Sequence, residues 1–180
     1  ERQLRQIFFP SFAAGIDAAA ASITVNSGEV NGIPVHADHH ILTDILREDL
    51  GFEGMVVTDW EDIKYLFKRH KVAANYKDAI EMAIHAGIDM SMVPGDLKFP
   101  GLLMELVREG RVSEARIDES VRRILSMKYD LGLFRTGGMP PALADSPAKE
   151  SLDGTAARAA LEGITLLKTA GQHAVNEGDP

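Results

Sequence analysis

Residues 55–62 read Met-Val-Val-Thr-Asp-Trp-Glu-Asp, so a short apolar run leads directly into three acids and the only tryptophan of the chain. An apolar run of this kind, bounded by Gly54 and the acids, predicts a buried strand over residues 55–58. In parallel α/β folds, functional groups lie at the carboxyl ends of strands. Asp59 follows the strand directly and is therefore the first candidate for a functional residue.

Similar short strands are predicted on both sides of this one, over residues 22–26 and 88–92. Helical patterns alternate with the strands over residues 2–20, 40–49, 76–86, 102–109 and 118–131. This alternation predicts an α/β fold with a parallel sheet and crossover helices. Three strands do not close a (β/α)₈ barrel, which takes roughly 250 residues. Residues 1–134 fit the C-terminal part of a TIM-type barrel better than a small open sheet, which would leave two strand edges unprotected.

The composition changes after residue 134. Residues 135–150 are rich in Gly, Pro, Ser and Ala and are predicted to be a linker. A helix over residues 155–162 and a strand over residues 164–168 follow, and the polar end of the chain is predicted to be disordered. One helix and one strand cannot enclose a core, so we interpret residues 151–180 as the incomplete beginning of a second α/β sandwich domain, and the chain as a fragment.

Charge and composition exclude several classes of function. The net charge of −8 makes nucleic acid and anionic membranes poor partners. The absence of cysteine excludes disulfides, zinc–thiolate sites and cysteine nucleophiles. No apolar run reaches the length of about 18 residues that a membrane span needs. A neutral or cationic small ligand fits the negative net charge. The sequence does not indicate an oligomeric state.

Asp59 and Trp60 have two interpretations each. Asp59 could act chemically at the end of its strand, or it could cap the next helix. Trp60 could stack against the face of a sugar, or it could pack into the core. Glu61 and Asp62 are both predicted to lie where the loop turns into solvent, Glu61 as a loop residue and Asp62 as a helix start.

Polar residues also follow the first predicted strand. Thr24, Asn26, Ser27 and Glu29 lie at the same end of the sheet as Asp59 and could line a pocket for a hydroxylated ligand. The alternative is turn formation, in which Asn and Ser side chains bind their own backbone. Asp89 lies at the start of its strand, so a structural role is predicted for it.

The segment His36-Ala37-Asp38-His39-His40 suggests a metal site by composition. The spacing argues against one, because the histidines precede the helix and no glutamate stands where a general base would be needed. We expect Asp38 to cap the helix and the histidines to be solvated. No metal ion or cofactor is predicted.

Taken together, several segments resemble glycoside hydrolase family 3 over about residues 2–168. These segments are NGIPVHA (31–37), LTDILR (42–47), GFEGMVVTDW (51–60), AGIDM (86–90), RIDESVRRIL (116–125), LGLF (131–134) and GITLLK (163–168). The resemblance implies a retaining β-glycosidase, of the β-glucosidase or exo-β-glucanase branch, that removes β-D-glucosyl residues from non-reducing ends. It implies a barrel domain followed by an α/β sandwich, and a β-glucoside or oligosaccharide as substrate.

The resemblance also assigns roles to residues. It implies that Asp59 is the nucleophile and that Trp60, Ser27 and Thr24 bind the sugar. A retaining enzyme needs a second carboxyl group, the general acid, which the family would supply from the second domain beyond Lys168. The isolated chain is therefore predicted to be inactive. Bacterial members are commonly periplasmic or secreted, which suggests the same location here.

The sequence departs from the family pattern in four places. Thr58 replaces a serine, and Asp38 replaces an asparagine, which adds charge near the expected site. The upstream lysine–histidine substrate motif and the general acid are absent from these residues. A β-xylosidase of the same family and a non-catalytic, truncated remnant are the remaining alternatives.

Overall fold

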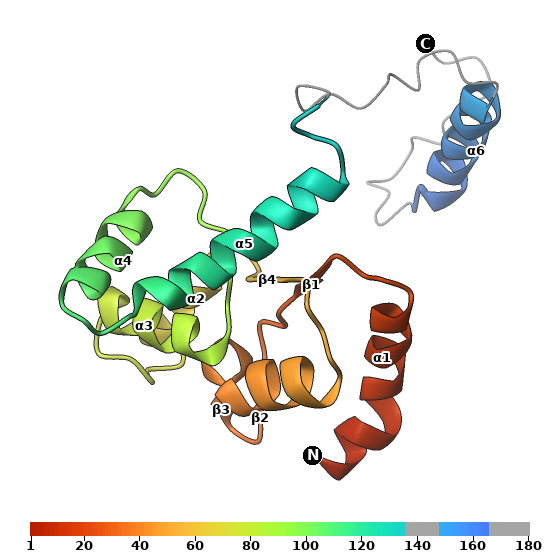
Figure 1. Cartoon of the computed structure of the whole chain (residues 1–180). Helices are drawn as coiled ribbons and strands as arrows, with labels where there is room; N and C mark the ends of the chain where they lie inside the picture. Colours follow the sequence, from red (N-terminus) through yellow and green to blue (C-terminus); the bar gives the residue numbers. More distant parts are fainter. Residues whose placement is uncertain (136–147, 166–180) are drawn as a thin grey trace, which may run out of the picture. The chain divides into compact units, whose positions relative to one another are not determined.

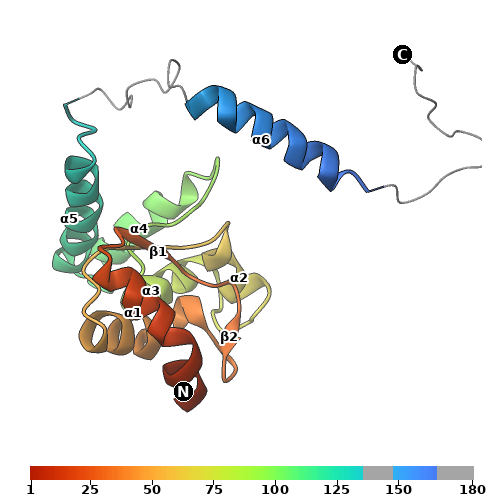
Figure 2. The ribbon, with the colours of Figure 1, turned by 90° about the vertical axis from the view of Figure 1, so that its right-hand side faces the viewer.

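The computed structural model describes residues 1–135 and 148–165. The chain divides into two compact units, residues 1–135 and 136–180, which are described separately (Figure 1). The first unit is a mixed α/β structure in which helices surround a few short strands (Figure 1 and Figure 2).

A short parallel sheet lies at the centre of the first unit. Strand β1 (Ser22–Thr24) pairs with β4 (Met55–Val57) in parallel, in a register that places Thr24 opposite Val57. The third predicted strand is reduced to a single parallel bridge between Val57 and Met90. This bridge is closed by the Thr58 N–H, which donates to the Met90 carbonyl at 3.0 Å. The predicted parallel arrangement is confirmed, but the third strand is shorter than predicted.

A small hairpin follows strand β1. Strands β2 (Glu29–Val30) and β3 (Ile33–Pro34) are antiparallel and are joined by Asn31 and Gly32, both with positive φ. A single turn of 3₁₀-helix, η2 (Val35–Ala37), then leads into helix η3. The turn residues fit a type I′ connection, which requires positive φ at both central positions.

The helices largely follow the sequence pattern. They are η1 (Leu4–Phe8), α1 (Phe9–Asp17), η3 (His40–Asp49), α2 (Asp62–Lys68), α3 (Tyr76–Ala86), α4 (Lys98–Arg108) and α5 (Glu114–Asp130). Helices η3 and α3 have the predicted bounds. Helices α4 and α5 begin four residues before their predicted starts, and α5 begins after Ser113, whose side chain accepts a hydrogen bond from the Arg116 N–H. Helix α2 begins at Asp62, the predicted helix start, although no end was predicted for it.

The core lies between the sheet and the helices on its outer face. Val56 is fully buried in it with Ile63, Leu66, Ile80 and Leu106. Because side chains of a strand alternate between faces, Val56 and Thr58 point toward this core while Val57 points the other way. The helical layer therefore covers one face of the strands.

The second unit contains one described helix, α6 (Ala148–Gly163). It begins before the predicted helix and includes the last residues of the predicted linker. Residues 164 and 165 are not in a strand, and the remainder of the predicted strand, like the rest of the linker and the polar tail, lies outside the described residues. Among the helices described, none has the length and apolar character that a membrane crossing requires.

Candidate active site

Thr24 and Asp59 lie on the same face of the sheet, opposite the face that carries Val56. Thr24 pairs in register with Val57, and Asp59 follows two residues later along the same chain direction. Residues two apart in an extended segment point to the same face. The alternation therefore places both polar side chains on one side of the sheet, at the carboxyl ends of β1 and β4.

Asp59 and Trp60 are both exposed at this strand end. The Trp60 side chain is 57% exposed, so core packing is excluded as its role in the described structure. The Asp59 carboxylate accepts a hydrogen bond from the Trp60 N–H at 2.6 Å. It does not cap α2, because Glu61 occupies the N-cap position and no side chain there makes a capping bond. The carboxylate and the indole are thus neighbours on an open surface.

The loop that carries these two residues is anchored on both sides of Glu61. Glu61 adopts a left-handed backbone conformation with φ of 58°, which is uncommon for a residue with a side chain. Its N–H donates to the Met92 carbonyl at 3.0 Å. Lys64 binds the Glu61 carboxylate at 2.6 Å and Asp96 at 2.8 Å, and these two hydrogen bonds, with Asp96 the larger influence, raise the pKa of Lys64. The anchors compensate for an unfavourable backbone conformation directly after Trp60.

Asp62 was predicted to face solvent, and this prediction is wrong. Asp62 does begin helix α2, but it is only 4% exposed. The Ser27 hydroxyl donates to Asp62 Oδ2 at 2.5 Å, and His36 Nε2 lies 3.6 Å from the same oxygen. The buried carboxylate therefore joins the loop after β1 to the loop after β4.

His36 was also predicted to be solvated, and it is buried with 3% exposure. Burial lowers the pKa of its imidazole, and the carboxylates of Asp62 and Asp59 oppose this shift only in part. The side chain is therefore neutral at pH 7. His39 and His40 are exposed as predicted.

Two further predictions from the sequence concern turn and cap chemistry. Asn26 accepts a hydrogen bond from the Gly28 N–H, so it forms the turn that was the alternative to ligand binding. Asp38 accepts from the Ile41 N–H at 3.2 Å, which confirms its capping role. Its carboxylate is buried at the start of η3 and is not at the site surface.

Glu29 binds His70 Nδ1 at 2.6 Å. In the described part of the chain, no cluster of three or more His, Asp or Glu side chains is arranged to hold a metal ion.

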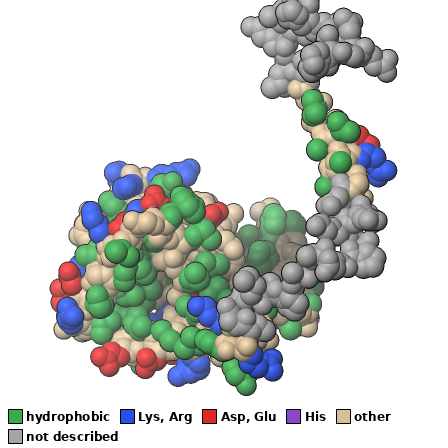
Figure 3. All heavy atoms as spheres, turned by 90° about the horizontal axis from the view of Figure 1, so that it is seen from above, with side chains coloured by type: hydrophobic (Ala, Val, Ile, Leu, Met, Phe, Trp, Pro, Cys, Tyr) green, Lys and Arg blue, Asp and Glu red, His purple; other side chains and the backbone are tan. Residues whose placement is uncertain are grey.

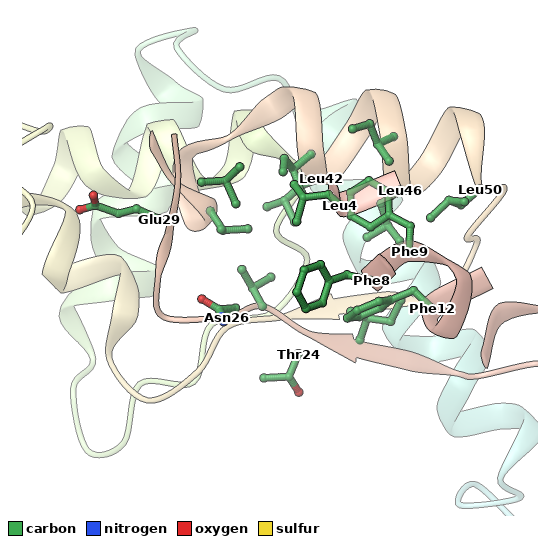
Figure 4. A pocket seen from close by; sticks show the side chains of 16 residues that line it. Leu4, Phe8, Phe9, Phe12, Thr24, Asn26, Glu29, Leu42, Leu46 and Leu50 are labelled. Atoms are coloured by element: carbon green, nitrogen blue, oxygen red, sulfur yellow. The ribbon is translucent and has the colours of Figure 1, made fainter. Parts of the chain in front are cut away.

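An apolar cavity of about 330 Å³ lies on the opposite side of β1. Phe8, Phe12 and Leu42 point into it, whereas Thr24 lies across the strand from the phenyl rings (Figure 4). Asp59, Trp60 and Ser27 are not among its lining residues. The first unit also has hydrophobic side chains gathered on one face with charged side chains around them (Figure 3). The cavity therefore shares Thr24 with the candidate site, but it is not lined by Asp59, Trp60 or Ser27.

The model of the N-terminal domain of glycosyl hydrolase family 3 matches residues 1–127. The chain belongs to glycosyl hydrolase family 3. The N-terminal domain of this family has a TIM-barrel-like α/β fold, and the first unit is a mixed α/β structure.

Relatives in this family are named as β-glycosidases. A protein of Dictyostelium discoideum named lysosomal β-glucosidase is 50% identical over 93% of the chain and 21% of its own length. A periplasmic β-glucosidase of Salmonella typhimurium is 36% identical over 89% of the chain and 21% of its length. A crystal structure of a Listeria innocua β-glucosidase in complex with glucose is 29% identical, with a TM-score of 0.78 over 95% of the chain and 23% of that protein. The chain thus spans about a fifth of the length of these relatives.

Sequence reasoning missed the supporting residues of the site. Lys64 follows Glu61 at a spacing of three, which is the spacing of ion pairs on helices, so this pair had a recognisable signal. The hydrogen bond from Ser27 to Asp62 links residues 35 positions apart. No pattern in the sequence indicated that these two loops meet.

Proposed function

We propose that this chain supplies the nucleophile of a retaining β-glycoside hydrolase that acts on non-reducing terminal β-D-glucosyl residues. Asp59 would attack the anomeric carbon to form a glycosyl-enzyme, which water then hydrolyses. The observation that carries this proposal is the placement of an exposed carboxylate beside an exposed indole, at the end of β4 and on the same face as Thr24. The names of the relatives support the same class of reaction.

Each proposed sugar contact has a distinct physical basis. The exposed face of Trp60 offers a flat apolar surface for the C–H groups of a pyranose ring. Thr24 at the end of β1 and Ser27 in the loop after it offer hydroxyl groups for sugar hydroxyls. A nucleophile must stay ionised at the working pH, and the Trp60 N–H donates a hydrogen bond to the Asp59 carboxylate.

The proposed reaction needs a second carboxyl group about 5–5.5 Å from the first. We propose that this general acid comes from sequence outside these 180 residues, and that residues 1–134 form the C-terminal part of a barrel that precedes a sandwich domain. The chain by itself would then bind and turn over glucosides poorly or not at all. The coverage of about a fifth of the relatives' length supports this arrangement.

A β-xylosidase is the second candidate within the same reaction class. It is favoured by a β-xylosidase of Formosa agariphila that is 34% identical over 74% of the chain. A truncated, non-catalytic remnant is the remaining alternative. The names periplasmic and lysosomal among the relatives support a location outside the cytosol.

The proposal is tested by replacing Asp59 in the complete protein and assaying aryl β-glucosides and β-xylosides. We expect Asp59→Ala to lose more than about 10³-fold in kcat/KM, because the covalent step loses its nucleophile. Added azide should restore turnover and yield the α-glycosyl azide, since the small anion attacks from the vacated side. Asp44→Asn, which changes an exposed carboxylate on η3, is the matched control. An Asp59→Ala variant with activity near that of the control would contradict the proposal.

A further inference from the structure

Three segments of the chain meet at the buried carboxylate of Asp62. Ser27 lies in the loop after β1, His36 lies in η2, and Asp62 begins α2. The hydroxyl of Ser27 donates to Asp62 Oδ2 at 2.5 Å, while His36 Nε2 is 3.6 Å from the same atom and makes no hydrogen bond within the described residues. Ser27 is therefore the hydrogen-bond donor to this oxygen among the three.

The direction of this hydrogen bond decides what Ser27 can offer to a ligand. A serine hydroxyl has one proton to donate and two lone pairs that accept. An ionised carboxylate only accepts, so the proton of Ser27 is committed to Asp62. Ser27 itself is exposed, whereas Asp62 is buried. The Ser27 oxygen that faces solvent can consequently only accept.

Asp62 is held in a fixed position, so it can keep accepting the hydrogen bond from Ser27 while a ligand binds. It is the first residue of a regular helix, and the helix is packed into the core through Ile63 and Leu66, which are 1% and 0% exposed. A charge-assisted hydrogen bond to a fixed carboxylate is about twice as strong as a neutral one. A ligand would have to break that bond to use Ser27 as a donor.

We propose that Asp62 is a positioning residue for specificity, which fixes Ser27 as a hydrogen-bond acceptor for one hydroxyl group of the sugar. This inference rests on the proposed function and adds the chemical character of one subsite. The subsite accepts a ligand group that donates a proton, such as a sugar hydroxyl. It gives no favourable bond to a fluorine atom, which cannot donate.

The test uses the complete protein with aryl β-glucosides in which single hydroxyls at positions 2, 3, 4 or 6 are replaced by hydrogen or by fluorine. For the 2-fluoro analogue, which accumulates as the glycosyl-enzyme, the second-order rate constant of inactivation takes the place of kcat/KM. Each analogue is measured with wild type and with Ser27→Ala, and the ratio of the two kcat/KM losses removes the intrinsic effect of the substituent. We expect one position at which both replacements show a coupling of about 3- to 10-fold, the range of one hydrogen bond. The other positions should show a coupling near one.

Two further variants separate positioning from folding. Ser27→Thr keeps the hydroxyl and should retain the coupling, whereas Asp62→Ala frees the Ser27 proton. In Asp62→Ala, the loss caused by fluorine should become smaller than the loss caused by hydrogen, because Ser27 can then donate to fluorine. Ser11→Ala, which changes an exposed serine on α1, is the control for a serine deletion elsewhere.

The proposal is overturned if fluorine is tolerated better than hydrogen at the coupled position in the wild type, since Ser27 would then be a donor. It is also overturned if Ser27→Ala shows no coupling at any position. Both results require measurable hydrolysis of glucosides by the complete wild-type protein through Asp59. An absence of all turnover in the wild type would instead contradict the proposed function.

Discussion

Replacement of Asp89 is predicted to destabilise the first unit more than any surface change. The side chain of Asp89 is fully buried and accepts hydrogen bonds from five groups. These are Arg47 Nη2 at 2.6 Å, Arg123 Nη1 at 2.9 Å, Ser120 Oγ at 2.9 Å, the Val56 N–H at 3.0 Å and Arg116 Nη1 at 3.4 Å. One carboxylate therefore fixes η3 and α5 to the centre of β4.

The size of the expected loss in folding free energy follows from the burial of the arginine side chains that bind Asp89. Burial lowers the pKa of Arg47 and Arg116, and the charge of Asp89 opposes that shift. Removal of Asp89 leaves several guanidinium groups facing one another without a counter-charge. Loss of one partner of a buried ion pair costs about 3–5 kcal/mol of folding free energy. We expect Asp89→Ala to lie at the upper end of this range and Asp89→Asn, which retains hydrogen-bond acceptors, at the lower end.

The assay is urea unfolding of the chain at pH 7, followed by circular dichroism. Arg123→Ala is the matched variant, because the Arg123 side chain is 26% exposed and Asp89 keeps its other partners. It should cost only about 1–2 kcal/mol. If Asp89→Ala costs less than about 1 kcal/mol, the view of Asp89 as the residue that joins these elements is wrong.

Four further predictions concern other positions. Gly54→Ala should weaken the pairing of β1 with β4, because a Cβ there would lie 2.6 Å from the Ala21 carbonyl. Gly15→Ala in helix α1 should instead stabilise the chain by about 0.5–1 kcal/mol, because a Cβ there meets nothing within 4 Å. Thermal melts of the two variants measure both effects. Because the folded-state pKa of His36 is lowered, the unfolded state binds the proton first, so stability should fall as the pH drops below about 6.5 and level off below the folded pKa. The difference in unfolding free energy between wild type and His36→Gln, measured from pH 7.5 to 5, should carry this slope, and a constant difference would refute it. Lys64→Met should release the loop of Trp60 and lower its fluorescence anisotropy, while Lys128→Met on α5 should not. Trp60→Ala in the complete protein should raise KM for glucosides by about 10-fold or more through loss of stacking, and an unchanged KM would remove the indole from the subsite.

The strands and most helices were predictable because their signals are local. The apolar run of β4 and the amphipathic face of η3, with Leu42, Ile45 and Leu46 buried, both appear in a few consecutive residues. Helix α3 was predicted with its bounds because Asn75 caps its start and Gly87, with φ of 125°, ends it. The third strand is shorter than predicted because only Met90 forms a bridge pair with β4, although the Asp89 N–H also donates to the Val56 carbonyl at 2.9 Å.

The site was only partly predictable for a related reason. The position of Asp59 follows from the end of β4, since strand ends are visible in the sequence. The burial of Asp62 and His36 depends on contacts between loops that are distant in the chain, and acidic or histidine residues in loops are usually solvated. The prediction of solvated side chains applied that average to two residues that lie next to each other in the interior, with His36 Nε2 3.6 Å from Asp62 Oδ2.

The central claim, that Asp59 is the nucleophile, is tested most directly by trapping the glycosyl-enzyme. The complete protein is incubated with an activated 2-deoxy-2-fluoro-β-glucoside, digested and analysed by peptide mass spectrometry. A retaining mechanism with Asp59 as nucleophile predicts one stoichiometric label on the peptide that contains residues 55–62, with fragmentation placing the sugar on Asp59. A label on Glu61 or Asp62, or inactivation without a covalent label, would contradict the account.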